Sequence, residues 1–135
     1  MTNWTDFKEN EDLSKVDKLD LLFVKQSELM QKYGIASVNI NTQQGQNTIR
    51  AISMHLIEEL CEIMHCLKNK NWVSYETEVD MPAMLDEVAD LTHFYIEVMI
   101  LLNQTPESLV QLYLKKHKTN LARIETKYWG EVNEQ

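Results

Sequence analysis

Residues 56–65 read LIEELCEIMH, and residues 85–94 read LDEVADLTHF. Each stretch holds acidic residues three positions apart, among apolar residues that recur at helical spacing: Glu59 with Glu62, and Glu87 with Asp90. Residues at this spacing share one face of a helix. A buried carboxylate is costly unless a positive group compensates for it. The two stretches therefore predict two helices whose carboxylates surround a common cation.

The rest of the chain also predicts helices. Its 135 residues include only 3 Gly and 2 Pro. Apolar periodicity and capping residues (Gly34 after the first helix, Asp80 or Met81 before Pro82, Thr105 before Pro106) place four helices at about residues 12–33, 48–68, 81–102 and 105–128. We expect a loop over residues 35–47. The fold class predicted is all-α: a four-helix bundle in one domain, residues 12–130, between polar tails 1–11 and 131–135.

Charge and composition narrow the possible partners. A formal net charge of −8 argues against binding a nucleic-acid polymer, which calls for a basic face. No apolar run approaches the ~18 residues of a membrane span. The first residues contain no apolar signal segment, and Cys61 and Cys66 are too close in one helix to pair. We therefore expect a cytoplasmic protein with free thiols and no membrane contact.

The carboxylates indicate a hard cation. If the second and third helices pack antiparallel, their acidic residues meet at one place, with Glu58 at the edge. Mg²⁺ prefers oxygen ligands and commonly binds substrate phosphates as well. A basic face on the fourth helix, formed by Lys116, Asn120 and Arg123 at positions i, i+4 and i+7, suits a phosphate-bearing ligand.

Other interpretations of these residues stay open. Glu62 with His65 and Asp90 with His93 match the ExxH-type pattern of di-iron carboxylate bundles, although all four lie on only two helices. Zinc bound by cysteine and histidine is a weaker possibility, because no CxxC pair supports it. The acidic residues can also be solvated stripes on a helical scaffold without catalysis.

The motifs together resemble the all-α nucleoside triphosphate pyrophosphohydrolases, a superfamily that includes dimeric dUTPases, phage dCTPase–dUTPases and MazG proteins. The resemblance covers about residues 19–129. It rests on EELCE (58–62) as EExxE, EVAD (87–90) as ExxD, the Lys-x-Trp of Lys70 and Trp72, DLTHF (90–94), and a tail matching Tyr113, Lys116, Asn120, Arg123 and Tyr128. The tail departs from the family's usual pattern at Ile124 and Lys127.

This resemblance implies hydrolysis of a deoxynucleoside triphosphate (dNTP) to the monophosphate and pyrophosphate, in a site between the second, third and fourth helices. Two or more Mg²⁺ ions, for which Mn²⁺ can substitute, would be held by Glu59, Glu62, Glu87 and Asp90. Glu58 would act as the general base, with Glu59 as the alternative. Phosphate contacts would come from Lys70, Lys116, Asn120, Arg123 and Tyr128.

The resemblance leaves the base and the oligomer open. Gln26 on the first helix and His93 are the candidates for contacting the base. The substrate expected is dUTP, dCTP or both; the alternative is a MazG-like enzyme acting on purine or several dNTPs. A homo-oligomer, either dimer or tetramer, is also expected.

Overall fold

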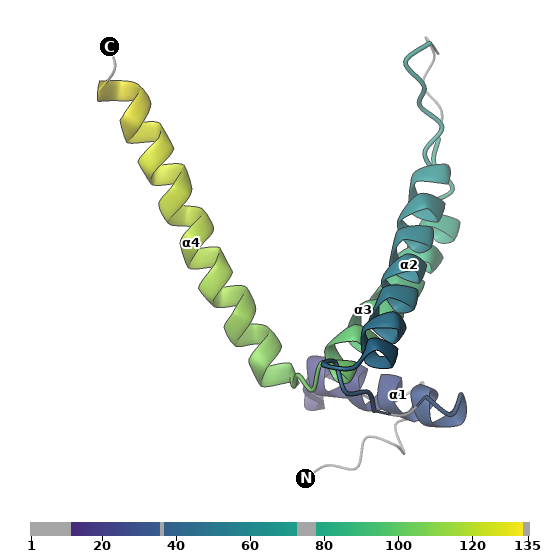
Figure 1. Cartoon of the computed structure of the whole chain (residues 1–135). Coiled ribbons are helices and arrows are strands. Elements are labelled where there is room, and N and C mark those ends of the chain that lie inside the picture. Colours follow the sequence, from purple (N-terminus) through teal and green to yellow (C-terminus); the bar gives the residue numbers. More distant parts are fainter. Residues whose placement is uncertain (1–11, 36, 73–77, 134–135) are drawn as a thin grey trace. The chain divides into compact units, whose positions relative to one another are not determined.

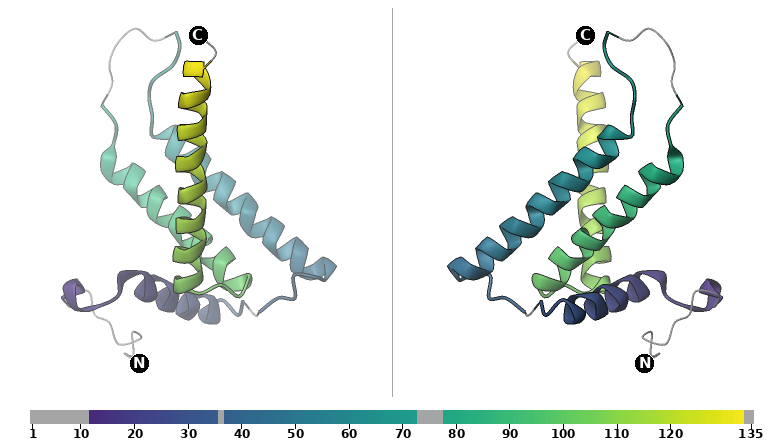
Figure 2. Two further views of the ribbon diagram at one scale, coloured as in Figure 1. Left: turned by 90° about the vertical axis from the view of Figure 1, so that its left-hand side faces the viewer. Right: turned by 90° about the vertical axis from the view of Figure 1, so that its right-hand side faces the viewer.

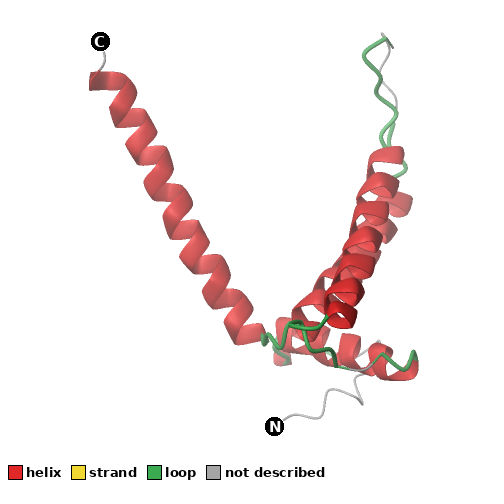
Figure 3. Ribbon diagram, viewed as in Figure 1, coloured by secondary structure: helices red, strands yellow, loops and turns green. Residues whose placement is uncertain are grey.

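The computed structural model describes residues 12–35, 37–72 and 78–133, with side chains as far as residue 127. All regular structure in these residues is helical (Figure 3). A short 3-10 helix, η2 (Leu13–Lys15), precedes the α-helices, which are α1 (Lys18–Lys32), α2 (Gln43–His65), α3 (Met81–Leu101) and α4 (Pro106–Asn133) (Figure 1). The all-α prediction is confirmed. No helix in this part of the chain has the length and apolar character needed to cross a membrane.

The chain divides into two compact units, residues 1–103 and residues 104–135. The first unit contains η2 and α1 to α3, and the second contains α4. Their assembly into one four-helix bundle stays a prediction.

The helix predicted over residues 12–33 is split near its start. Val16 is extended and ends η2, and Asp17 then caps α1 by accepting hydrogen bonds from the backbone N–H groups of Leu19 and Asp20, both at 3.1 Å. The other end agrees with the prediction. Gly34 adopts φ +70°, and the N–H of Ile35 donates to the carbonyl of Met30 at 2.9 Å, which closes the helix with a Schellman motif.

Helix α2 begins at Gln43, so the predictions of a loop through residue 47 and a start at Thr48 were wrong. Thr42 caps this helix, with its hydroxyl accepting from the N–H of Gly45 at 3.0 Å and donating to the carbonyl of Asn39 at 2.7 Å. A Cβ at Gly45 would collide with that Asn39 carbonyl. The first turn was missed because it is polar, and only its cap identifies it.

Both later helices begin at the predicted caps. Asp80 accepts from the N–H of Ala83 at 3.1 Å at the start of α3. Thr105 accepts from the N–H of Ser108 at 3.1 Å at the start of α4, and the Ser108 hydroxyl accepts from Thr105 in return at 2.9 Å. Helix α4 continues to Asn133, beyond the predicted end at 128.

In the first unit, α2 and α3 lie side by side and run in opposite directions, as the views in Figures 1 and 2 agree. Helix α1 packs against α3. A small apolar cluster joins all three helices: Met30 from α1, Ile52 from α2 and Leu101 from α3 are buried, and Phe94 and Val98 pack against them. This cluster lies at the end of the α2–α3 pair nearest α1, and it holds α1 against α3.

Candidate functional site

Three carboxylates from two helices meet beyond the apolar cluster. Glu59 on α2 and Glu87 and Asp90 on α3 each offer one oxygen, and these oxygens all lie within 4.8 Å of one another. The antiparallel packing of α2 on α3 brings the two acidic stretches to the same level. Three of the four carboxylates predicted as metal ligands therefore converge in the fold, and the fourth, Glu62, is hydrogen-bonded to Glu87.

Mutual repulsion perturbs this acidic group. A hydrogen bond with the Glu62 carboxyl, reinforced by desolvation and by the charges of Glu62, Glu59 and Asp90, raises the pKa of Glu87 to about 7. Such a bond requires one of the two carboxyls to be protonated. Burial, with the charges of Glu62 and Asp90, also raises the pKa of Glu59. The group thus retains a proton near neutral pH unless a cation replaces it.

One oxygen of the Glu59 carboxylate also lacks a group that would compensate its negative charge. Its Oε2 atom is buried and has no hydrogen-bond partner among the described residues. A buried carboxylate oxygen without a donor is destabilising. An atom of this kind, beside two further carboxylates, is suited to a ligand with positive charge.

Glu58 lies apart from the three converging carboxylates. It is exposed, and its Oε2 lies 3.0 Å from Nδ1 of His55, one turn earlier on α2. Its charge contributes to the raised pKa of Glu59, but less than those of Glu62 and Asp90. The geometry therefore offers Glu58 as a partner of His55, and leaves Glu59 as the carboxylate that enters the site.

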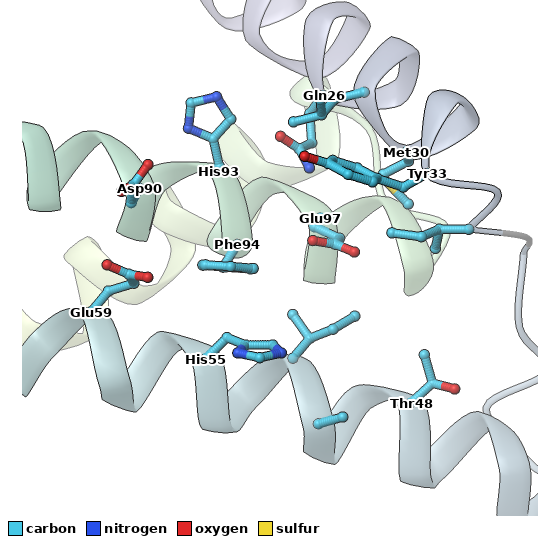
Figure 4. A pocket seen from close by; sticks show the side chains of 14 residues that line it. Gln26, Met30, Tyr33, Thr48, His55, Glu59, Asp90, His93, Phe94 and Glu97 are labelled. Atoms are coloured by element: carbon cyan, nitrogen blue, oxygen red, sulfur yellow. The ribbon is translucent and has the colours of Figure 1, made fainter.

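A cavity of about 650 Å³ extends from the acidic group along the interface of α1, α2 and α3 (Figure 4). Glu59 and Asp90 line one end, and Gln26, Tyr33, Thr48 and Glu97 line the other. This volume lies in the range typical of small-molecule sites. One end of the cavity is acidic, and the other combines apolar and polar groups.

Aromatic rings line the middle of the cavity. The ring of His55 stacks on that of Phe94, with centroids 5.1 Å apart and planes at 19°. His93 also lines the cavity, and its Nδ1 lies 2.8 Å from the carbonyl oxygen of Ala89. Because a carbonyl only accepts, Nδ1 must carry the hydrogen, and Nε2 is the nitrogen left for another partner.

Two polar side chains are buried at the far end. Gln26 is 5% exposed, and its Oε1 has no hydrogen-bond partner among the described residues. Glu97 is 6% exposed; burial raises the pKa of its carboxyl, and His55 lowers it to a smaller extent. The prediction that Gln26 stands on the first helix at a ligand site is consistent with its place in the cavity wall.

The remaining predicted residues belong to the segment after α2 and to α4. Lys70 and Trp72 are exposed on the segment after α2, and neither lines the cavity. Lys116, Asn120 and Arg123 are exposed on α4, in the second unit, and the Tyr128 side chain lies outside the described residues. Phosphate binding by these five residues stays a prediction. The group of described residues that could hold a metal ion consists of three carboxylates, without the histidine or cysteine that the iron and zinc alternatives require. Cys61 and Cys66 are free thiols.

Sequence reasoning missed two cavity residues. His55 lies four positions before Glu59, and Glu97 lies seven positions after Asp90, so each shares a helix face with a predicted carboxylate. Extending each acidic face by one or two turns would have found both.

No family model, no curated protein sequence and no solved structure matches this chain.

Proposed function

We propose that this protein is a metal-dependent nucleoside triphosphate pyrophosphohydrolase, which converts a dNTP and water to the monophosphate and pyrophosphate. The observation that carries the proposal is the meeting of carboxylates from α2 and α3 at one end of a cavity of about 650 Å³. The acidic end suits cations that accompany a triphosphate, and the aromatic and polar end suits a nucleoside. The order of motifs in the sequence supports the same reaction.

The donors present fit Mg²⁺. All are carboxylate oxygens, the ligands that Mg²⁺ prefers. Binding of Mg²⁺ would also supply a partner for Oε2 of Glu59, which has no hydrogen bond with the described residues. We assign Glu59, Glu87 and Asp90 as ligands, with Glu62, hydrogen-bonded to Glu87, as the fourth. When bound, Mg²⁺ would lower the pKa of a water molecule and offset negative charge on the phosphates.

The protein's own part in the reaction is proton transfer and positioning. Water attacks the α-phosphorus, the bond from that phosphorus to the bridging α–β oxygen breaks, and pyrophosphate leaves with the bond's electrons. Glu59, which lies at the acidic end of the cavity, takes the proton from the water. Glu58, favoured for this role from the sequence, instead orients His55 through their 3.0 Å contact.

The middle of the cavity positions the nucleoside. The stacked pair of His55 and Phe94 lies between the acidic group and Gln26, where a sugar or base would be held against a flat apolar surface (Figure 4). Positioning of this kind brings the α-phosphorus in line with the water. The residues at the other end of the cavity, among them Gln26 and Glu97, would determine the choice of base. The base would be a pyrimidine or, as in the MazG-like alternative, a purine.

We also propose that the protein forms a homo-oligomer, either a dimer or a tetramer. Ile57, Leu60 and Met64 lie along one side of α2 and are each about half exposed, at 51%, 49% and 57%. Clustered exposed apolar side chains mark interaction surfaces. Light scattering coupled to size-exclusion chromatography tests this, and replacing Leu60 with Lys should shift the mass toward the monomer.

A product assay tests the proposed reaction. The purified protein is incubated with Mg²⁺, or with Mn²⁺, and with each of dUTP, dCTP, dTTP, dATP and dGTP separately, and products are resolved by anion-exchange chromatography. Monophosphate and pyrophosphate in equal amounts are expected from at least one dNTP. Glu59→Gln should reduce kcat by a factor of at least about 100 while leaving the helical circular dichroism unchanged. Absence of turnover with every nucleotide would leave a helical scaffold or an iron protein as the alternatives.

A further inference from the structure

Glu97 is a buried carboxyl for which the proposed chemistry has no use. It lies on α3 seven residues after Asp90, which is two helical turns or about 10 Å along the axis. It lines the cavity, and it has neither a hydrogen bond nor an ion pair with the described residues. A buried carboxyl of this kind costs stability unless a ligand uses it.

The groups around Glu97 indicate which hydrogen-bonding groups such a ligand must carry. Gln26, also nine-tenths buried, lines the same end, and its Oε1 is an acceptor without a donor. In its ionised form the carboxylate of Glu97 is likewise an acceptor only. His55, which acts electrostatically on the Glu97 carboxyl, already has Glu58 at its Nδ1. Gln26 Oε1 and the Glu97 carboxylate therefore line one end of the cavity without a hydrogen bond from the described residues.

The position along the cavity identifies the part of the ligand concerned. A nucleotide whose phosphates lie at Glu59 and Asp90 would pass His55 and Phe94 and place the outer edge of its base at Gln26 and Glu97 (Figure 4). Bases differ at this edge. Cytosine and adenine present an amino group beside a ring nitrogen that accepts, and guanine presents an amino group beside a ring N–H, whereas uracil and thymine present a carbonyl on each side of one N–H.

We propose that Glu97 selects nucleotides whose base carries an exocyclic amino group, and rejects uracil and thymine. The amino group donates one hydrogen to the Glu97 carboxylate and, for cytosine or adenine, the other to Oε1 of Gln26, whose own N–H₂ group donates to the ring nitrogen. With uracil or thymine in the same place, a base carbonyl would face the carboxylate, and two acceptors would oppose each other. Sites that bind through buried polar groups discriminate strongly against a ligand that leaves them unpaired.

This inference rests on the proposed function, and one set of measurements separates the two. The kcat/KM is measured with Mg²⁺ for dCTP, dATP, dGTP, dUTP and dTTP, using wild-type protein, Glu97→Gln and Glu28→Gln. Glu28 pairs with Lys25 and Lys32 on α1 and does not line the cavity, so its variant is the matched control. Wild type should favour at least one amino-bearing nucleotide over dUTP by roughly tenfold or more, the effect expected for a hydrogen bond to a charged group.

Glu97→Gln supplies an amide N–H₂ that can donate to a carbonyl. It should lower kcat/KM for the preferred nucleotide and raise it for dUTP, reducing their ratio by about tenfold or more, whereas Glu28→Gln should leave the ratio unchanged. Equal or better hydrolysis of dUTP or dTTP by wild type would overturn the role of Glu97 and leave the proposed reaction standing. That comparison needs no variant, so it stands even if Glu97→Gln does not fold. Hydrolysis of none of the five would overturn both.

Comparison among the amino-bearing nucleotides identifies the ligand further. Preference for dCTP assigns a pyrimidine, preference for dATP a purine with the same donor–acceptor edge, and preference for dGTP a paired contact of its N1–H and amino group with Glu97 alone. Each of these supports the proposal. Binding of the corresponding monophosphates, measured by calorimetry without metal, should follow the same order as kcat/KM.

Discussion

Binding of Mg²⁺ should depend on pH because it must displace the proton that the Glu87 carboxyl retains. The pKa of Glu87 is raised to about 7. If only the ionised group binds metal, the apparent affinity should be roughly tenfold weaker at pH 6 than at pH 8, and binding should release ~0.9 proton per site at pH 6 and ~0.1 at pH 8. Calorimetry in two buffers of different ionisation enthalpy measures both quantities.

Controls separate this proton from others. In Glu62→Gln the side-chain amide can donate to ionised Glu87, so the proton released at pH 6 should largely disappear. Asp86→Asn, one residue from Glu87 and outside the three converging carboxylates, should behave as wild type. Equal Mg²⁺ affinity at pH 6 and pH 8, or no binding at millimolar Mg²⁺, would refute the reasoning.

The same group makes metal-free stability depend on pH. The folded-state pKa of Glu87 lies above the usual value of 4.5, so the folded state binds this proton more tightly than the unfolded state does. Stability from this group is therefore full below about pH 4.5 and is lost as pH rises through about 7. Melting temperature without metal should fall across this window, and Mg²⁺ should restore it most strongly at the upper end.

Three further predictions concern packing, backbone geometry and phosphate binding. Leu101→Ala removes a side chain that is 2% exposed, and it should lower the free energy of unfolding by about 2–4 kcal/mol in urea titrations followed by circular dichroism. Gly45→Ala should destabilise by more than about 1 kcal/mol in the same assay, because its Cβ would collide with a backbone carbonyl, whereas a helical glycine without that contact would gain stability on the same change. Lys116→Ala and Arg123→Ala should each raise KM for the dNTP severalfold if α4 binds phosphate, and unchanged KM and kcat in both would remove α4 from the site.

The fold could be predicted where local signals were complete. Asp80 and Thr105 combine a capping side chain with a following proline at the first or second helical position, and both helices begin there. The start of α2 lacked an apolar stripe, so Thr42 was passed over. The break at Val16 interrupts an apolar pattern that continues on both sides, and periodicity alone does not register it.

The site was predictable to the extent that it depends on spacing within one helix. Three carboxylates converge as the i, i+3 pattern requires, once α2 and α3 are antiparallel. A helical angle gives the direction of Glu58 but not its partner: its carboxylate contacts His55, three residues before it, and its role as general base stays a prediction. Glu97 was overlooked because a single Glu in an apolar helix carries no motif, and its burial depends on α1 packing across α3.

The placement of the cavity among α1, α2 and α3 has a consequence for the amount of protein in a cell. The buried residues of the first unit form a small cluster beside this cavity, so a bound molecule would add contacts that the chain alone lacks. A ligand present at 100 times its dissociation constant stabilises the folded state by about 2.7 kcal/mol. Proteases remove unfolded chains, and differences of this size change abundance severalfold. The steady-state level of the protein should therefore rise and fall with the supply of its ligand, at constant synthesis.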